Sequence, residues 1–581
     1  MKKISLIAYI ALSLAAATGC QKQLAEDNPS GLTSQLVYTT PEGFESLVNA
    51  AYSYTRAWYG KEEGYNLTEM GSDLWLPGVD NRRLDLMLYN NLQGSEAGLS
   101  ATEVFIERLW QRSYQAVNLC NAGIAGVAKS GMAPSLQKTR EAELRFLRAF
   151  YYWHIVEQWG GVHFTTEPTE AAQTTSNRTP VAKFYEQIIA DLNFAVENLP
   201  PTSTQWGRAT KPAAEAFLSR IHLTRGNNQQ ALDLAKKVIS GYSYALNAKY
   251  KDLWTMANAT NGAANKEVIW AVNYTSNLTY GDLSTTVTNT DGTTTIINPD
   301  GHPRGGNNGH LHFCMAYERS AAGAIGMQRD VANGRPFARY MPTKFLLNLF
   351  DETKDARYEA TFKQAWICNK GGTYDKKIGG NTIKVSLAVG DTAILAMKGE
   401  MPDAVEATKK YLVIDESKMY KADGKIAANS LYLQFRKFDD PARPSMNEVQ
   451  SARDVFVLRL AEMYLVAAEA AFKLGRPADA AADINVIRSR AAQPGQTAAM
   501  QVSATDISLD FILDERAREF AGEQLRWFDL KRTGKLVERV RKYNPEAASF
   551  IKDYHVLRPI PQKQLDAVVN KTEFTQNEGY K

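Results

Sequence analysis

Cysteine is scarce in this sequence, with four residues in 581. One of them, Cys20, lies near the N-terminus, and the other three, Cys120, Cys314 and Cys368, are scattered and odd in number. This spacing offers neither a disulfide framework nor a CxxC metal-binding pair. We therefore expect the three internal cysteines to be buried free thiols.

Charge of one sign and long apolar runs are also scarce. The 67 Lys and Arg residues are nearly balanced by 63 Asp and Glu residues, the net charge is +4, and no basic run stands out. A nucleic-acid partner is therefore not expected. Beyond the N-terminus, no stretch of the sequence is apolar enough to cross a bilayer.

The N-terminus has the pattern of a bacterial lipoprotein signal. Two lysines precede an apolar segment, 4–17, which is shorter than the ~20 residues that span a membrane. Small residues then lead to Cys20, in a pattern similar to a lipobox. We expect residues 1–19 to be removed, Cys20 to carry lipid, and residues 20–39 to tether a single folded domain, 40–581. The alternative is an ordinary signal peptide that is cut elsewhere.

Helical patterns begin near residue 40. The segment 40–60 opens with Thr40 as a possible N-cap, followed by proline and acidic residues in the first turn. The segments 103–128 and 142–161 predict longer helices. The second of these is apolar almost all round, which is typical of a helix packed on several sides, and its Gly160 is a plausible C-terminal stop.

Two stretches, 223–240 and 472–489, resemble each other. Each turns at a glycine, Gly226 or Gly475, has alanine five residues later, and continues as a helix with small residues on its packing face. This spacing is typical of tetratricopeptide-type helix–turn–helix repeats. A further helical segment follows at 506–534.

The middle of the chain has a different composition. The segment 265–274 is rich in β-branched and aromatic residues and predicts a strand. It leads into a stretch rich in Thr, Asn and Gly. We therefore expect an irregular insertion with short strands over about 241–453, between helical halves at about 40–240 and 454–581. Insertions in helical repeats tend to emerge on one face, often the binding face.

Several motifs follow one another along the chain. The N-terminal one is "AELRFLRAFYYWHIVEQWGGV", and the C-terminal ones are "RLAEMYLVAAEAAFKLG", "INVIRSRA", "ILDERAREFAGEQLRWFDLKRTGKL", "LRPIPQ" and "QNEGY". Between them stand "GHLHFCMAYE", "NGRPFARYMPT" and "LLNLFDETKDARY". With these motifs in this order, the sequence resembles the SusD/RagB family over nearly its whole length, and the middle motifs resemble its longer members. One departure is Glu578, where the closing motif more often carries proline.

The resemblance implies a mostly α-helical fold with four tetratricopeptide-like helix pairs and the irregular middle folded over one side. It implies a lipid-anchored protein on the outer face of the outer membrane. It also implies a partnership with a SusC-like TonB-dependent barrel, over whose mouth the lipoprotein acts as a lid. The usual ligand class in the family is an oligosaccharide, although some relatives carry peptides. A tethered lid works through effective concentration, so its own ligand affinity need not be high.

The segment "DERAREFAGEQLRWFDLKR" is dense in charge. Spacings of three and four residues on a helix bring opposite charges together. The segment therefore predicts a structural ion-pair network rather than a hydrolytic pair of carboxylates, and its members are Asp514, Glu515, Arg516, Arg518, Glu519, Glu523 and Arg526. A second charged group is expected to tie the insertion together, with a ligand role for one member as the alternative: Arg329, Asp330, Arg335 and Arg339.

His310 and His312 alternate, which would place both on one face of a strand. With His302 nearby, they raise the question of a metal. No carboxylate or cysteine completes a set at a familiar ligand spacing. We therefore expect hydrogen bonding within the insertion, and neither a metal nor another cofactor.

A sugar binder needs a flat apolar surface and a few fixed polar groups, because pyranose C–H faces pack on Trp or Tyr while hydroxyls need donors and acceptors. Two loops carry this mixture, in the regions from which the family builds its ligand face. The candidates are Trp75, Asp80, Asn81, Arg82 and Tyr89 in the first loop and Tyr280, Arg304, Asn307, Asn308 and His310 in the second. Trp75 is the leading candidate, and the alternative is that it packs and anchors the loop.

The main hypothesis is a non-catalytic lipoprotein that binds oligosaccharides and delivers them to a TonB-dependent transporter. The second is a peptide-binding lid of the RagB type. The third is a surface glycoside hydrolase, which would need paired carboxylates ~5–10 Å apart across a cleft. No such pair is assignable from the sequence.

Overall fold

A computed structural model describes residues 38–100, 103–169, 171–260, 264–275, 285–288, 294–297 and 306–581. The predicted signal peptide, the lipidation site Cys20 and two ligand candidates, Tyr280 and Arg304, lie outside these ranges. The fold is mostly helical with short strands, as the sequence predicts. Among the described helices, none combines the length and the apolar character needed to cross a membrane.

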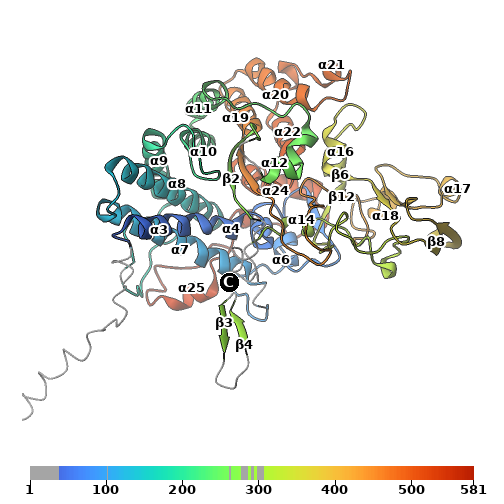
Figure 1. The fold of residues 1–581 in the computed structure, drawn as a ribbon, viewed down its shortest axis with the longest axis horizontal. Coiled ribbons are helices and arrows are strands. Elements are labelled where there is room, and N and C mark those ends of the chain that lie inside the picture. Colours follow the sequence, from blue (N-terminus) through green and yellow to red (C-terminus); the bar gives the residue numbers. More distant parts are fainter. Residues whose placement is uncertain are drawn as a thin grey trace, which may run out of the picture.

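The scaffold is a row of antiparallel helices in which each helix packs on the next (Figure 1). The row starts at α3, where Thr40 accepts a hydrogen bond from the Gly43 amide and confirms the predicted N-cap. Helix α8 is buried on all sides from Ala142 to Trp159, as its composition predicts, and ends at Gly160 with φ +72°. The row comprises α3 (Pro41–Ser53), α7 (Phe105–Gly126), α8 (Pro134–Trp159), α9 (Val181–Asn198), α10 (Lys211–Thr224), α11 (Asn228–Gly241), α19 (Leu460–Lys473) and α20 (Pro477–Ala491).

The two similar stretches of sequence are neighbours in this row. Gly226 links α10 to α11 and Gly475 links α19 to α20, both with positive φ. Helix α11 packs directly against α19, although they lie far apart in sequence. The predicted repeats are therefore consecutive units of one helical row, and the segment between them is an insertion in that row.

The insertion begins and ends on paired strands. β2 (Val268–Val272) confirms the strand predicted in 265–274, and it pairs antiparallel with β13 (Val455–Arg459). Both strands are buried throughout. The chain therefore leaves the scaffold and returns to it at adjacent positions.

The insertion is built around a second hydrophobic core, to which the segment after α3 also contributes. Much of the insertion lies on the right of Figure 1, where β6, β8 and α18 are labelled, while its strands β3 and β4 lie at the bottom of the picture. Its short sheets place β10 between β7 and β11 and pair β8 with β9, β6 with β12 and β3 with β4. The strands are β3 (Thr285–Thr288), β4 (Thr294–Ile297), β6 (Phe362–Lys363), β7 (Ala365–Ile367), β8 (Gly372–Ile378), β9 (Asn381–Leu387), β10 (Thr392–Ala396), β11 (Leu412–Ile414) and β12 (Gln434–Phe435).

Short helices connect these parts. The helices of the N-terminal half and of the insertion are α4 (Thr55–Trp58), α5 (Glu62–Thr68), α6 (Leu84–Leu88), α12 (Met256–Thr260), α14 (Gly309–His312), α15 (Lys344–Asn348), α16 (Arg357–Thr361), α17 (Asp403–Glu406) and α18 (Glu416–Met419). Those of the C-terminal half are α21 (Thr497–Met500), α22 (Leu509–Phe520), α23 (Arg526–Arg532), α24 (Leu536–Tyr543) and α25 (Gln562–Ala567). The three internal cysteines are buried free thiols, as predicted.

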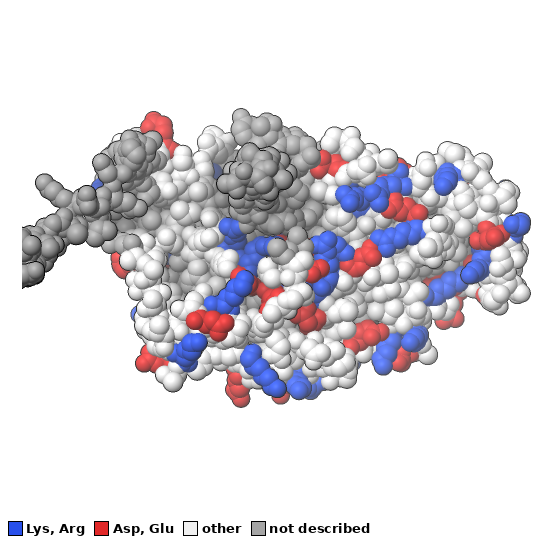
Figure 2. Space-filling model, turned by 90° about the horizontal axis from the view of Figure 1, so that it is seen from below, with Lys and Arg blue, Asp and Glu red and all other residues white. Residues whose placement is uncertain are grey.

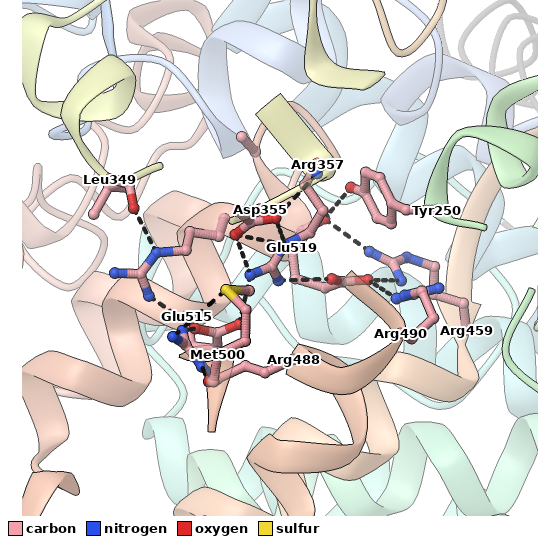
Figure 3. Close-up of polar contacts among 12 residues, drawn as sticks. Tyr250, Leu349, Asp355, Arg357, Arg459, Arg488, Arg490, Met500, Glu515 and Glu519 are labelled. Atoms are coloured by element: carbon pink, nitrogen blue, oxygen red, sulfur yellow. Dashed lines mark hydrogen bonds and ion pairs between the residues drawn. The ribbon is translucent and has the colours of Figure 1, made fainter. Parts of the chain in front are cut away.

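The charged segment on α22 and α23 forms the predicted structural network, but its partners are mostly distant in sequence. Glu519 binds Arg459, Arg490 and Arg357, which come from β13, α20 and α16 (Figure 3). The pairs of Arg518 with Glu515 and of Arg532 with Asp529 have the expected helical spacing. The network therefore joins the C-terminal helices to both the scaffold and the insertion.

Three acidic members of this network are closed to solvent, while the fourth, Asp514, is 26% exposed and binds Arg539. Glu515 and Glu519 are fully buried, and Glu523 is 7% exposed. Glu523 binds Arg459 and the buried Lys437. Because these carboxylates are occupied by cations inside the protein, they do not form a hydrolytic pair facing a cleft.

Candidate ligand face

The first predicted loop meets the insertion through a short ladder. β1 (Trp75–Pro77) pairs antiparallel with β5 (Tyr340–Pro342). The pairing continues past the strands, because the Gly78 amide donates to Arg339 O at 2.8 Å and the Asp80 amide to Ala338 O at 3.1 Å. A Cβ on Gly78 would lie 2.3 Å from Ala338 O, so only glycine allows this approach.

This ladder places polar side chains of the two segments on one face. We call it the loop face and define it as Val79–Arg82, Arg335–Arg339 and Arg319. Asp80 forms an ion pair with Arg319, and both side chains are about one third exposed. Asn81 donates from Nδ2 to Arg339 O at 3.0 Å, while its Oδ1 accepts from the Arg83 amide.

A buried carboxylate lies under the loop face and holds two of its arginines. Glu62, on α5, binds Arg339 Nε at 3.1 Å and Arg82 Nη1 at 3.8 Å. Burial raises the pKa of Glu62 to about 7, although Arg339 and Arg82 oppose the shift. The Arg82 side chain is 36% exposed, so its remaining N–H donors face solvent.

The loop face carries one aromatic ring, Phe337, which is half-buried. The Arg335 and Arg339 guanidiniums lie 5.7 Å and 5.4 Å from the centre of this ring. Among the described residues, Arg335 has one hydrogen-bond acceptor, Asn447 O, at a long distance of 3.4 Å. The face thus combines a partly open ring with planar donors and with acceptors, the mixture that suits sugar hydroxyls.

Two of the predicted ligand residues are core residues. Trp75 is fully buried against Phe313 and Phe435, and its Nε1 donates to Glu69 at 3.0 Å. Tyr89 is 3% exposed and donates to Gly71 O. Neither ring has a face open to a surface ligand, which contradicts the stacking role expected for Trp75 and the contact role expected for Tyr89. The alternative, that Trp75 packs and anchors the loop, is what the structure shows.

The described residues of the second loop are also buried, and two of them support the first loop from below. Asn307 bridges to Ser451, and its Oδ1 accepts from the Gly309 amide. The Asn308 amide donates to Gly60 O, and its Oδ1 lies 3.1 Å from His312 Nε2. The polar atoms of Asn307 and Asn308 thus serve the fold, and contact of either residue with a ligand stays a prediction.

His310 and His312 do not lie on a strand. They lie on the single helical turn α14, so the strand prediction is wrong. The turn forms because Asn307 and Asn308 supply local side-chain hydrogen bonds that favour it over extended backbone. His310 is 6% exposed, which contradicts a surface contact, and burial lowers its pKa well below the usual value. Among the described residues, no group of His, Cys, Asp and Glu could hold a metal.

The sequence located the loop face in part. Asp80, Asn81 and Arg82 lie on it, and whether they bind a ligand stays a prediction. Arg335 and Arg339 were expected to tie the insertion together, and the contact of Arg339 with Glu62 confirms this for Arg339. Arg329 binds Glu318, and Asp330 holds Asn333. The places of Arg319, Phe337 and Glu62 on or under the loop face could not be predicted, because a three-residue strand pairing gives no local signal in the sequence.

Charges of both signs alternate over the outer surface. Figure 2 shows basic and acidic residues interspersed over the face seen from below, and no area of one sign dominates the part of that face that the structure describes. The arginines of the loop face that retain open donors are a local exception to this pattern.

Comparison with known proteins gives consistent matches. The model of the SusD family matches residues 266–580, and a model described as "Starch-binding associating with outer membrane" matches residues 77–223. A SusD-like protein of Formosa agariphila is 25% identical and is covered over its full length, as is this chain. The starch-binding protein SusD of Bacteroides thetaiotaomicron is 28% identical over 78% of this chain and 74% of its own.

Solved structures share the fold. A laminarin-binding SusD-like protein superposes with a TM-score of 0.66 at 22% identity, covering 93% of this chain and 99% of the other. A surface glycan-binding protein A from Bacteroides fluxus gives 0.63 at 18% identity, with the same two coverages. At these identities, the likeness concerns the fold alone.

Proposed function

The chain belongs to the SusD family, and from this premise we propose that it is a non-catalytic, lipid-anchored protein of the outer membrane that binds oligosaccharides at the loop face. It passes them to a SusC-like TonB-dependent transporter, on which it sits as a lid. A relative named for starch binding supports the ligand class. The palmitate-type anchor rests on Cys20 and its preceding small residues.

One observation carries the binding proposal. The ladder between β1 and β5 joins Asp80–Arg82 to Arg335–Arg339, so donors, acceptors and a ring from two distant segments share one face. Arg82 and Arg335 retain N–H donors that face solvent, and Phe337 offers part of a ring. Sugars are bound by such pairs of planar polar groups and ring faces.

The test is isothermal titration of the chain lacking residues 1–20 with oligosaccharides of starch and of laminarin. Arg82→Ala and Arg335→Ala are each expected to weaken binding about tenfold or more, because a charged hydrogen bond contributes ~1.5–3 kcal/mol. Arg476→Ala is the matched control, since Arg476 is a half-exposed arginine on the far helix pair whose ion-pair partner is Asp479. Binding of peptides with no binding of any glycan would replace this proposal with the peptide-binding lid.

The anchor and the partner need a second experiment. Cys20→Ala is expected to move the protein out of the outer-membrane fraction, because lipid chains on one residue supply the membrane affinity. The wild-type protein, solubilised in detergent, is expected to co-purify with a large β-barrel protein. Recovery of the unlipidated wild type without such a barrel would contradict the proposed delivery role.

A further inference from the structure

A second concave site lies away from the loop face, between the C-terminal end of α3 and the strand β2. We call it the α3–β2 groove. It has a volume of about 330 Å³ and is lined by α3, α4, the 205–208 turn and the end of β2. This volume is at the lower end of the range of small-ligand pockets. The groove shares no residue with the loop face.

One wall of the groove is rigid and already neutralised. Arg208 donates to Glu143 at 2.9 Å, to Glu45 at 3.0 Å and to Asn49 at 2.9 Å. Its guanidinium also lies 5.6 Å from the centre of the Tyr52 ring. Because its donors and its charge are taken up within the protein, Arg208 fixes the shape of the wall and is not available to a ligand.

The opposite wall carries a different kind of arginine. Arg56, on α4, is half-buried and donates from Nε to Asn273 O at 2.9 Å. Its guanidinium lies 5.7 Å from the centre of the Tyr274 ring. Asp454 is the carboxylate that acts on Arg56 electrostatically. Its two oxygens accept from Trp206 Nε1 and from the Tyr274 amide, and it makes no direct ion pair with Arg56. Within the described ranges, the two Nη atoms of Arg56 have no acceptor. A partly desolvated guanidinium in a groove favours an anionic partner.

Two further groups in the groove fit a sugar. Trp206 is half-buried, and its Nε1 donates to Asp454 at 2.9 Å, which fixes the plane of the indole ring. Asn273 donates from Nδ2 to Trp206 O at 2.6 Å, while its Oδ1 is buried and accepts no hydrogen bond from any described residue. A buried acceptor without a donor carries a free-energy cost that a ligand hydroxyl would remove.

The backbone of the 205–208 turn is built around these groups. Gly207 has φ +88°, and a Cβ at this position would lie 2.5 Å from Asn273 Nδ2. The Gly207 carbonyl accepts from Trp270 Nε1 at 2.9 Å. The turn, β2 and α4 are therefore locked together, and the groove is preorganised.

We propose that the α3–β2 groove is a second binding site that takes an acidic sugar unit. The carboxylate or sulfate ester of the sugar accepts hydrogen bonds from Arg56, one hydroxyl donates to Asn273 Oδ1, and the apolar ring face packs on Trp206. This inference goes beyond the proposed function, because it does not depend on what binds at the loop face. With this second site, the protein selects charged saccharides.

The experiment titrates the chain lacking residues 1–20 with digalacturonate, with galactose 6-sulfate and with neutral galactobiose. Saturable binding of an acidic probe, with neutral galactobiose at least tenfold weaker, is expected. Arg56→Gln is expected to weaken the acidic probe about ten- to a hundredfold, and Arg56→Lys by less. Arg476→Gln, at an ion-paired surface arginine that directly precedes α20, serves as the control and is expected to leave the affinity unchanged.

A measurement on the wild type keeps the test independent of any folding defect. Raising the NaCl concentration is expected to weaken the acidic probe and not galactobiose, because salt screens the Arg56 charge. Binding of digalacturonate alone identifies a carboxylate ligand, and binding of galactose 6-sulfate alone identifies a sulfate ester. Equal binding of acidic and neutral probes, no binding of either acidic probe, or an affinity unchanged in Arg56→Gln would overturn the proposal. None of these outcomes bears on the loop face, which is tested with starch and laminarin oligosaccharides.

Discussion

Arg459, at the end of β13, donates to Glu519, on α22, across 2.6 Å in the buried interior. This contact ties the strand that closes the insertion to the C-terminal helices. Glu519 also binds Arg357 and Arg490, so it is shared by three guanidiniums. The residue is therefore a junction between the scaffold, the insertion and the C-terminal segment.

Glu519→Gln is expected to destabilise the fold strongly. Removing one partner of a buried ion pair leaves uncompensated charge inside the protein, at a cost of ~3–5 kcal/mol. Glu538→Gln is the matched control, because Glu538 pairs with Lys535 at the surface, where such pairs contribute less than about 1 kcal/mol. Urea unfolding of the three proteins gives the comparison, and equal stabilities of the two variants would contradict the role of the network.

The same network predicts how stability depends on acid. Burial alone would raise the pKa of Glu515, but Arg357, Arg518 and Arg488 together outweigh it and lower this pKa to about 2. The pKa of Glu519 is likewise lowered, because Arg490, Arg459 and Arg357 outweigh its burial. In the unfolded chain, the pKa of a glutamate side chain is 4.5.

Because these folded pKa values lie below the unfolded one, the stabilisation is fully present above about pH 4.5. It is lost as the pH falls from 4.5 toward 2, by on the order of 1 kcal/mol per unit of pKa shift. The free energy of unfolding, measured in urea at a series of pH values, checks the direction. Glu519→Gln is expected to flatten the curve in this window, and a wild-type stability that rises on acidification through it would contradict the account.

Gly522→Ala is expected to be more costly than the same change at Gly475. Gly522 has φ +78°, and a Cβ there would lie 2.6 Å from Phe435 Cζ. Gly475 has φ +74°, with nothing within 4 Å of the added carbon. Both substitutions carry the left-handed backbone cost of ~1–2 kcal/mol, and only the first adds ~1–3 kcal/mol of overpacking. Equal losses of the free energy of unfolding in the two variants, measured by chemical denaturation, would contradict the close approach of Phe435 to Gly522.

Trp75→Ala is expected to reduce the stability of the fold rather than to remove a direct contact with a ligand. Truncating a buried tryptophan costs ~3–5 kcal/mol, and here it also removes the donor that binds Glu69. Titration of the folded variant with starch and laminarin oligosaccharides separates the two roles. A large loss of affinity with wild-type stability would restore Trp75 as a contact residue.

The elements predicted from local patterns agree with the structure where the signal is local. Thr40, the turn glycines Gly226 and Gly475, and the strand around Trp270 each depend on neighbouring residues alone, and each is confirmed. The strand predicted at His310 and His312 is wrong, because a spacing of two residues is compatible with either a strand or a helical turn. The hydrogen bond of the Asn308 side chain favours the turn.

The candidate site was less predictable, because its residues are brought together by long-range pairing. The strand pairing involves few residues on each side, Trp75 to Asp80 and the segment that ends at Pro342. No periodic pattern in the sequence predicts it. Burial of Trp75 follows from rings on Phe313 and Phe435, which are remote in sequence. Composition therefore located the loop but could not decide which of its side chains face outward.

The antiparallel clasp between β2 and β13 has an evolutionary consequence. Because it holds the two ends of the insertion side by side, the length and content of that segment can change without disturbing the contact of α11 with α19. Changes inside the insertion therefore reach the helical row through the pairing of β1 with β5 and through the contact of Arg357 with Glu519, and not through the two ends of the insertion.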